Sequence, residues 1–238
     1  MRRGRVLSVL VAVIVAVIAG STAYVWHLGY LGGPVYTVVE ARGADRDGTV
    51  AVFFSGDMGF NAGMGPTIAG HIADAGIPVL AVNSLTAFAH RRSVVASNTL
   101  VADAVARAEA MPGAKRVMLI GQSFGANIVL AGAAALPPAL KRNVAIVELI
   151  VPSDSMLFRA TPGGAFDITH DGPALPYAQQ LTGPNVLCLH GESETGSLCP
   201  EWHQRNVTSV ALPGGHFLHE DSALVTATLL RALGGPDA

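Results

Sequence analysis

The segment Gly121–Gly125, which reads G-Q-S-F-G, is the feature that most constrains the fold of this chain. It follows the apolar run 116–120 and precedes the small, helix-favouring run 126–136. A G-x-S-x-G motif between a strand and a helix is typical of the nucleophile elbow of α/β-hydrolases. Its glycines are needed because a side chain there would strike the neighbouring strand or helix. The motif therefore predicts an exposed nucleophile, Ser123, at the N-terminus of a helix.

Apolar runs that alternate with helical segments predict the rest of the fold. Strands that read as unbroken apolar runs are buried on both faces of a sheet. The order predicts an α/β-hydrolase fold with a mostly parallel central sheet, helices on both faces, and a preceding N-terminal transmembrane or signal helix. The irregular stretch 153–181 is expected to be a lid or a substrate-shaping insertion. We expect strands at Val35–Glu40, Thr49–Phe54, Ile77–Asn83, Lys115–Ile120, Asn143–Val151, Asn185–His190 and Val207–Leu212, and helices at Thr67–Gly76, Ser93–Met111, Phe124–Leu136 and Ser222–Leu233.

Composition excludes two classes of protein. Hydrophobic residues make up 50% of the chain and charged residues 13%, which supports a large core and argues against disorder. The net charge is −2, and no cluster of lysine or arginine follows the N-terminus, so no nucleic-acid partner is expected.

The length of 238 residues fits one domain of ordinary size. We expect a signal anchor or signal peptide at 1–33 and the hydrolase domain at 34–238.

The N-terminus predicts export. Arginines in the first five residues precede an almost wholly apolar run at 6–25, and Tyr24, Trp26 and Tyr30 follow like an interfacial aromatic belt. About 20 apolar residues can span a bilayer as a helix, and the positive end stays in the cytoplasm. The alternative is a signal peptide cleaved at the small-x-small pattern 21–23. The length of the run favours an uncleaved anchor.

The two cysteines agree with export. Cys188 and Cys199 are the only cysteines of the chain, and they flank a short loop. In an exported domain this spacing predicts one disulfide that ties down the loop. Two reduced core thiols are the alternative.

An elbow serine needs a base, and in this fold the base follows the acid along the chain. His216 lies in the sequence P-G-G-H-F, directly after the last predicted strand and before the last predicted helix. We therefore expect His216 to be the general base. His219 is the main alternative, and His170 and His190 are less well placed.

The acid is expected after the penultimate strand. Many hydrolases have H-G-x-x-D there, and Glu194 occupies the aspartate position of H-G-E-S-E at 190–194. Its task is to fix the imidazole tautomer and stabilise imidazolium, which either acidic residue type can do. Glu194 is the expected acid, with Glu192 and then Asp154 as alternatives.

Two backbone donors are needed to form an oxyanion hole. One is expected from the N–H of Phe124, and the second from Asp57 or Met58 in the glycine-containing loop 54–59. The Asp57 side chain has two interpretations, a turn cap or a group that attracts a cationic part of the substrate. Gln122, beside the nucleophile, is a further candidate for substrate binding.

Four separated motifs resemble the family of bacterial virulence proteins called VirJ. They are F-F-S-G-D at 53–57, G-Q-S-F-G-A at 121–126, S-L-C-P at 197–200 and P-G-G-H at 213–216. The resemblance covers roughly residues 50–230. It implies a periplasmic α/β-hydrolase, linked to type IV secretion and to hydrolysis of aminoacyl-phosphatidylglycerol, chiefly the lysyl lipid.

The resemblance thus implies a serine esterase that acts on a membrane lipid headgroup and is held at the inner membrane by its N-terminal helix. The chain departs from the family pattern at Phe60, 86–93 and Phe217, positions expected to line the substrate site. Within 86–93, Arg91 or Arg92 is a candidate ligand of a lipid phosphate, and surface charge is the alternative.

No metal or cofactor is expected, because the chemistry needs none and no metal-ligand spacing is present. Two other functions remain open. One is a general exported carboxylesterase that acts on small esters. The other is an accessory periplasmic protein that binds secretion-system proteins without turnover.

Overall fold

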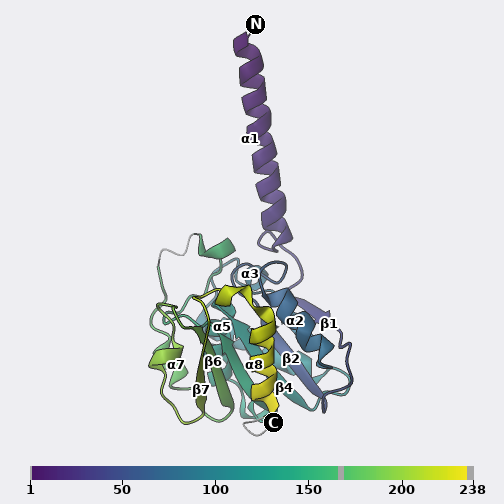
Figure 1. Cartoon of the computed structure of the whole chain (residues 1–238), viewed down its shortest axis with the longest axis vertical. Helices are drawn as coiled ribbons and strands as arrows, with labels where there is room; N and C mark the ends of the chain where they lie inside the picture. The colour runs from purple at the N-terminus through teal and green to yellow at the C-terminus, as the bar shows by residue number, and fades with distance from the viewer. Residues whose placement is uncertain (1, 166–168, 235–238) are drawn as a thin grey trace.

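Seven strands form one central sheet in the computed structural model of the chain, which describes residues 2–165 and 169–234 (Figure 1). The strand order is β1-β3-β2-β4-β5-β6-β7. Strand β1 pairs antiparallel with β3, and the other neighbouring strands pair in parallel. The strands are β1 Tyr36–Val39, β2 Thr49–Phe54, β3 Val79–Val82, β4 Arg116–Gln122, β5 Val144–Ile150, β6 Asn185–Gly191 and β7 Val207–Leu212.

Helices cover both faces of this sheet. Helices α4 and α5 pack on each other and on one face, and α2 and α8 pack together on the other. The longer helices are α1 Arg2–His27, α2 Gly65–Asp74, α4 Val94–Glu109, α5 Phe124–Ala134 and α8 Ser222–Gly234. The shorter ones are α3 Ser84–Ala87, α6 Pro138–Lys141, η1 Pro162–Gly164, α7 Leu175–Ala178, η2 Cys199–Glu201 and η3 Leu218–Glu220.

Strand β4 explains why the central strands read as unbroken apolar runs. Successive side chains of a strand point to opposite faces of the sheet. Val117 and Leu119 belong to the core beneath α4 and α5, whereas Met118 and Ile120 belong to the core beneath α2 and α8. Both faces are buried, so no polar alternation appears in the sequence. The predicted α/β-hydrolase architecture is confirmed.

Most predicted elements are present with ends displaced by a few residues. The helix expected at Thr67–Gly76 runs from Gly65 to Asp74, and the strand expected at Thr49–Phe54 is unchanged. The short helix α3 was not predicted. The stretch 153–181 is largely irregular, as expected, but contains η1 and α7, and its residues 166–168 lie outside the described part of the chain.

Helix α1 projects away from the domain and meets it beside α3 (Figure 1). Its segment Val6–His27 is long and apolar enough to cross a membrane. The side chains from Val6 to Ile18 are exposed, as expected for a helix that has no protein around it. Leu28, just beyond the helix, is fully buried in the core of the domain.

Candidate active site

Ser123 lies in the sharp turn between β4 and α5. Its φ of 51° and ψ of −119° are unusual for a residue with a side chain. The turn is fixed from below, because the Ser123 N–H donates to the carbonyl oxygen of Ile150 at 2.8 Å. This is the strained strand-to-helix turn that the motif predicts.

The two glycines of the elbow are required by close backbone packing. A Cβ atom at Gly121 would lie 2.5 Å from the Gly125 oxygen, in the first turn of α5. A Cβ atom at Gly125 would lie 2.3 Å from the Ser55 oxygen and 2.5 Å from the Phe54 oxygen. These atoms are backbone and have no room to move aside. The elbow is therefore wedged between its own helix and the end of β2.

Three side chains from the ends of three strands form one hydrogen-bonded series. The Ser123 Oγ lies 2.8 Å from the His216 Nε2, and the His216 Nδ1 lies 2.5 Å from a Glu194 carboxylate oxygen. The other Glu194 oxygen accepts the Gly191 N–H at 3.1 Å. The Glu194 side chain is only 4% exposed, which shields its contact with the imidazole from water. The structure thus brings together the three residues that the sequence singles out.

The alternative histidines lie in other surroundings. His219 packs against the loop before His216, since a Cβ atom at Gly214 would lie 2.2 Å from its ring. His190 is at the end of β6 with its Nδ1 3.3 Å from the Gly191 oxygen. The His170 Nδ1 lies 3.2 Å from the Ser155 Oγ.

The alternative acids also lie elsewhere. Glu192 is exposed at the end of β6. Asp154 is exposed and takes part in the loop packing through its backbone, donating to the Gly196 oxygen and accepting from Ala174. Among these acids, Glu194 is the one that contacts the His216 ring.

The loop that carries His216 is held by an unusual turn. Residues 218–220 all have φ between 47° and 58°, the left-handed region that costs roughly 1–2 kcal/mol for each residue with a side chain. The turn is closed by the Leu218 N–H, which donates to Gly215, and the Leu218 side chain is buried. Such strain persists only where the surrounding packing imposes it.

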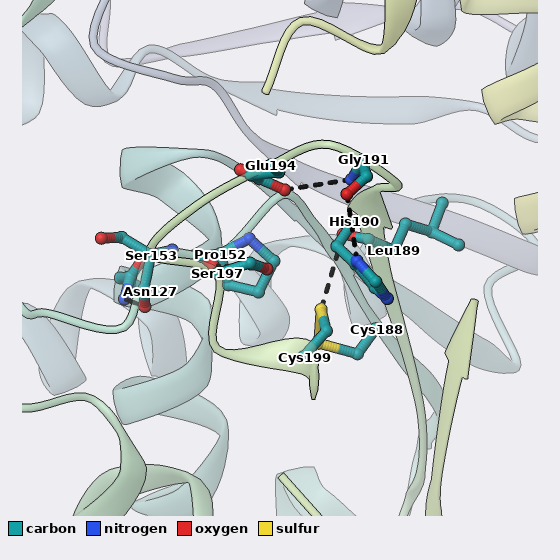
Figure 2. Close-up of a disulfide and its surroundings, with 10 residues drawn as sticks. All are labelled: Asn127, Pro152, Ser153, Cys188, Leu189, His190, Gly191, Glu194, Ser197 and Cys199. Atoms are coloured by element: carbon teal, nitrogen blue, oxygen red, sulfur yellow. Dashed lines mark hydrogen bonds between the residues drawn. A yellow bond between two sulfur atoms is a disulfide. The ribbon is translucent and has the colours of Figure 1, made fainter. Parts of the chain in front are cut away.

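The loop that carries Glu194 is clamped at both sides. Cys188 of β6 and Cys199 are joined by a disulfide that encloses this loop (Figure 2). On its other side, the Leu198 N–H donates to the Pro152 oxygen at 3.0 Å, and Ser153 and Ser197 form a short β-bridge. The disulfide and the bridge together hold the acid under the histidine.

The turn Gly56–Gly59 lies against the elbow. It is closed by the Gly59 N–H, which donates to the Gly56 oxygen at 3.1 Å. A Cβ atom at Gly56 would lie 3.6 Å from the Ser123 Cβ, so the two backbones approach closely. Phe124 is the first residue of α5, where a helical N–H has no carbonyl one turn earlier to receive it.

Ser123 and His216 border two cavities, which we call the large cavity and the polar pocket. The large cavity has a volume of about 560 Å³. Apolar side chains dominate its wall, and it also contains two carboxylates: the lining includes Tyr24, Asp57, Met58, Met64, Gln122, Val151, Phe217 and Glu220. The polar pocket is smaller, at about 190 Å³, and is lined by Asp57, Asn127, Ser153, Ser155 and Leu157. No lysine or arginine of the described chain lines either one.

The two arginines considered for phosphate binding lie away from these cavities. Arg91 forms an ion pair with Asp171. The Arg92 guanidinium lies over the Phe88 ring, 5.6 Å from its centroid, and donates to the Ala87 oxygen. The structure therefore does not bring Arg92 to Ser123.

Several site residues were missed by sequence reasoning. Asn127 was the most visible of them, as a lone amide in the apolar helix α5, and it exchanges hydrogen bonds with the Ser153 backbone at 2.8 and 2.9 Å. Tyr24 and Met64 carried no such signal. Their place in the wall follows from how distant segments pack together.

A model of the family described as bacterial virulence protein (VirJ) matches residues 48–235. The chain belongs to the VirJ family. None of the curated proteins matches it in sequence. The family assignment agrees with the resemblance carried by the four motifs.

Solved structures share the fold of this VirJ-family chain at low sequence identity. Est1E from Butyrivibrio proteoclasticus is 13% identical with a TM-score of 0.62, over 83% of this chain and 92% of that one. The α/β hydrolase GrgF from Penicillium sp. sh18 is 15% identical with a TM-score of 0.61, over 83% and 96%. An α/β serine hydrolase homologue from Coxiella burnetii is 16% identical with a TM-score of 0.59, over 83% and 90%. These likenesses establish the α/β-hydrolase fold.

Proposed function

We propose that the chain is a serine esterase that hydrolyses the aminoacyl ester of an aminoacyl-phosphatidylglycerol such as lysyl-phosphatidylglycerol. The observation that carries the proposal is the hydrogen-bonded series Ser123–His216–Glu194 at the border of two cavities. A binding protein has no need of this arrangement.

In the first half of the reaction the Ser123 Oγ attacks the ester carbonyl carbon. His216 Nε2, 2.8 Å away, accepts the hydroxyl proton, and the carboxylate of Glu194 stabilises the imidazolium that forms. The C–O bond to the glycerol then breaks, and His216 returns the proton to the leaving alcohol oxygen. Phosphatidylglycerol departs and the aminoacyl group stays on Ser123.

The negative charge that develops on the carbonyl oxygen needs fixed donors. The Phe124 N–H at the start of α5 supplies one, and the Asp57–Met58 segment of the neighbouring turn supplies the second. Water then attacks the acyl-enzyme with His216 as base, which releases the free amino acid and restores the Ser123 hydroxyl.

The charge around Ser123 favours an ester with a protonated amine. Asp57 borders both cavities and Glu220 borders the large one, whereas no lysine or arginine of the described residues does. We assign the aminoacyl part to the polar pocket, whose wall carries the side chains of Asn127, Ser153 and Ser155, and the lipid alcohol to the larger cavity. Both assignments follow from matching polarity and size.

The same proposal includes a location. Residues 1–33 form the anchor, 34–238 form the hydrolase domain, and the domain lies in the periplasm at the inner membrane. Hydrolysis there would alter the surface charge of the membrane. Contacts with secretion-system proteins are the second candidate role and belong to the family resemblance alone.

The test is ester turnover by the full chain, with wild type beside Ser123→Ala and the control Ser209→Ala, an exposed serine on β7. Lysyl- and alanyl-phosphatidylglycerol and a short p-nitrophenyl ester are supplied. We expect the amino acid to be released, with a loss of about 10⁵-fold or more in Ser123→Ala and no change in Ser209→Ala. Turnover of the p-nitrophenyl ester alone would favour a general carboxylesterase, and no Ser123-dependent turnover by folded protein would favour the accessory binding protein.

A further inference from the structure

The C-terminal end of α1 is part of the packing of the domain. Leu28 is fully buried in the core that also contains residues of α4 and α5. Side-chain donors of the domain hold three successive backbone carbonyls: Asn61 donates to His27 at 2.6 Å, Asn83 to Leu28 at 3.1 Å and Thr86 to Gly29 at 2.8 Å. The helix therefore does not join the domain through a free linker.

The turn that borders Ser123 also contacts this junction. A Cβ atom at Gly59 would lie 2.5 Å from the Leu28 oxygen, so the turn and the end of α1 have no space between them. The same turn approaches Ser123 through Gly56. One short segment thus contacts the nucleophile at one end and the membrane helix at the other.

Helix α1 also contributes directly to the large cavity. Tyr24, in its last turn, lines this cavity together with Ser123 and His216. Phe217 lines the same cavity, and its side chain is 72% exposed. Exposed aromatic side chains at the end of a membrane helix favour the level of the lipid headgroups.

The length of α1 determines where the large cavity lies relative to the bilayer. The 22 residues Val6–His27 span about 33 Å at 1.5 Å per residue, close to the roughly 30 Å of a bilayer's hydrocarbon core. Tyr24 then lies at the membrane surface on the exported side. The large cavity must lie at that surface too, because Tyr24 forms part of its wall.

We propose that α1 is retained in the working protein and that the large cavity receives its ester directly from the bilayer that α1 spans. The glycerol part of the lipid passes beside Tyr24 and Phe217 while its fatty chains stay in the membrane. This inference rests on the proposed function and adds the source of the substrate. A cut at 21–23 would remove the membrane span before Tyr24, and with it the attachment that keeps the large cavity at the bilayer surface.

The test uses the full chain in phosphatidylglycerol vesicles and two serine-directed probes. A long-chain alkyl fluorophosphonate stays in the bilayer, and a short-chain one is soluble in water. Each labels Ser123 as its Oγ bonds to phosphorus, fluoride leaves and His216 takes the proton, so labelling does not depend on the amino acid recognised. The long-chain probe is placed either in the protein's own vesicles or in separate, protein-free vesicles.

We expect labelling by the long-chain probe at least tenfold faster in the protein's own vesicles than from separate ones. Tyr24→Ala is expected to lower the ratio of long-chain to short-chain labelling at least fivefold. The control is Trp26→Ala. Trp26 is an exposed aromatic residue in the same helical turn, but it lines a different cavity. In this variant the ratio of long-chain to short-chain labelling is expected to stay within twofold of wild type.

Labelling at equal rates from both vesicle populations would overturn this inference, as would labelling by the short-chain probe alone. Both results would leave a serine hydrolase standing. Labelling by neither probe would overturn the proposed function and this inference with it. Isolation of a protein whose N-terminus begins after residue 23 would also overturn the inference.

Discussion

Ser123 and Glu194 lie in one hydrogen-bonded series, but the regions around them are built differently. The elbow lies among central, buried elements, where backbone atoms of β2 and α5 leave no room around the glycines. The Glu194 loop follows β6, beside the edge strand β7, most of whose side chains are partly or fully exposed. There, a disulfide and loop hydrogen bonds fix the position of Glu194, as core packing fixes the position of Ser123 at the elbow.

This difference teaches that the geometry of a hydrogen-bonded series of three residues can be kept by two physical means. Steric exclusion by backbone atoms cannot be relaxed without moving the sheet, so damage to it affects folding and position together. Cross-links on a loop can be lost one at a time with a smaller displacement of the side chains that the loop positions. Four variants would break or sharpen the comparison, ordered below by their expected effect on turnover.

Glu194→Gln is expected to have the largest effect. An amide does not hold the His216 ring in the required tautomer or stabilise its cation, so turnover should fall about 10³–10⁴-fold while the fold persists. Steady-state kinetics measure the turnover, and thermal unfolding measures whether the fold persists. Glu192→Gln is the matched control at an exposed neighbour, and a larger loss in the control would contradict the assignment of the acid.

Gly125→Ala tests the elbow through sterics alone. The new methyl group would meet the Phe54 and Ser55 oxygens, so β2 and α5 must separate. We expect a loss of about 2–3 kcal/mol in the free energy of unfolding, and about 10²-fold lower turnover from the displaced nucleophile. In the control Gly70→Ala, the nearest atom would be 3.6 Å away at the tip of Arg42, and stability should not fall. Unaltered stability in Gly125→Ala would show that the backbone around the elbow can move aside, which would contradict steric exclusion as its means of support.

Replacing both cysteines, as Cys188→Ala with Cys199→Ala, tests the clamped loop. The disulfide closes a loop across a sequence separation of 11, and its loss should cost about 2–3 kcal/mol of stability. Turnover should fall less than tenfold, because the bridge between Ser153 and Ser197 remains. Thermal unfolding of the variant beside oxidised wild type measures the effect, and reduced wild type should unfold like the variant. An equal loss of turnover in this variant and in Gly125→Ala would remove the distinction between the two regions.

Glu148→Leu should leave turnover unchanged and alter stability only. Glu148 lies on β5 between the two regions, and neither of its carboxylate oxygens has a hydrogen-bond partner in the described part of the chain. Burial raises the pKa of this carboxyl well above its ordinary value. The folded state therefore favours the protonated form, and the contribution of Glu148 to stability falls as pH rises from about 4.5 towards the raised pKa, by about 1.4 kcal/mol per pH unit.

Denaturant unfolding at pH 5, 6 and 7 measures this dependence. The stability gained by Glu148→Leu should increase over that range, whereas the exposed control Glu40→Leu should show no such trend. A constant difference between Glu148→Leu and wild type at all three pH values would mean that Glu148 is charged in the folded protein.

Sequence reasoning found the parts of the site that depend on local chemistry. The elbow was predictable because a strand, two glycines and a helix leave one position for Ser123. His216 was predictable because the last strand of a parallel sheet ends at the same edge as β4. The position of the acid in the H-G-x-x-D pattern favoured Glu194 over Glu192, and the structure places the Glu194 carboxylate against the His216 ring.

Other features depended on packing between distant segments. Arg92 was a candidate ligand of a lipid phosphate, with surface charge as the alternative, and its guanidinium lies over the Phe88 ring rather than beside Ser123. The short helix α3 has only four residues, too few for a helical period to appear in the sequence. Its Thr86 and the adjacent Asn83 hold the end of α1 across more than fifty residues of chain, which no local pattern indicates.

The hydrogen bonds at His27, Leu28 and Gly29 fix the domain to the end of α1, which determines the substrate concentration that the site meets. If this chain hydrolyses a lipid ester in the membrane that α1 spans, as proposed, it searches for substrate in two dimensions. Its rate then follows the mole fraction of the ester among the lipids and is insensitive to the volume of surrounding water. Inert lipid added to the bilayer slows it, whereas diluting the vesicles leaves each molecule working at the same speed.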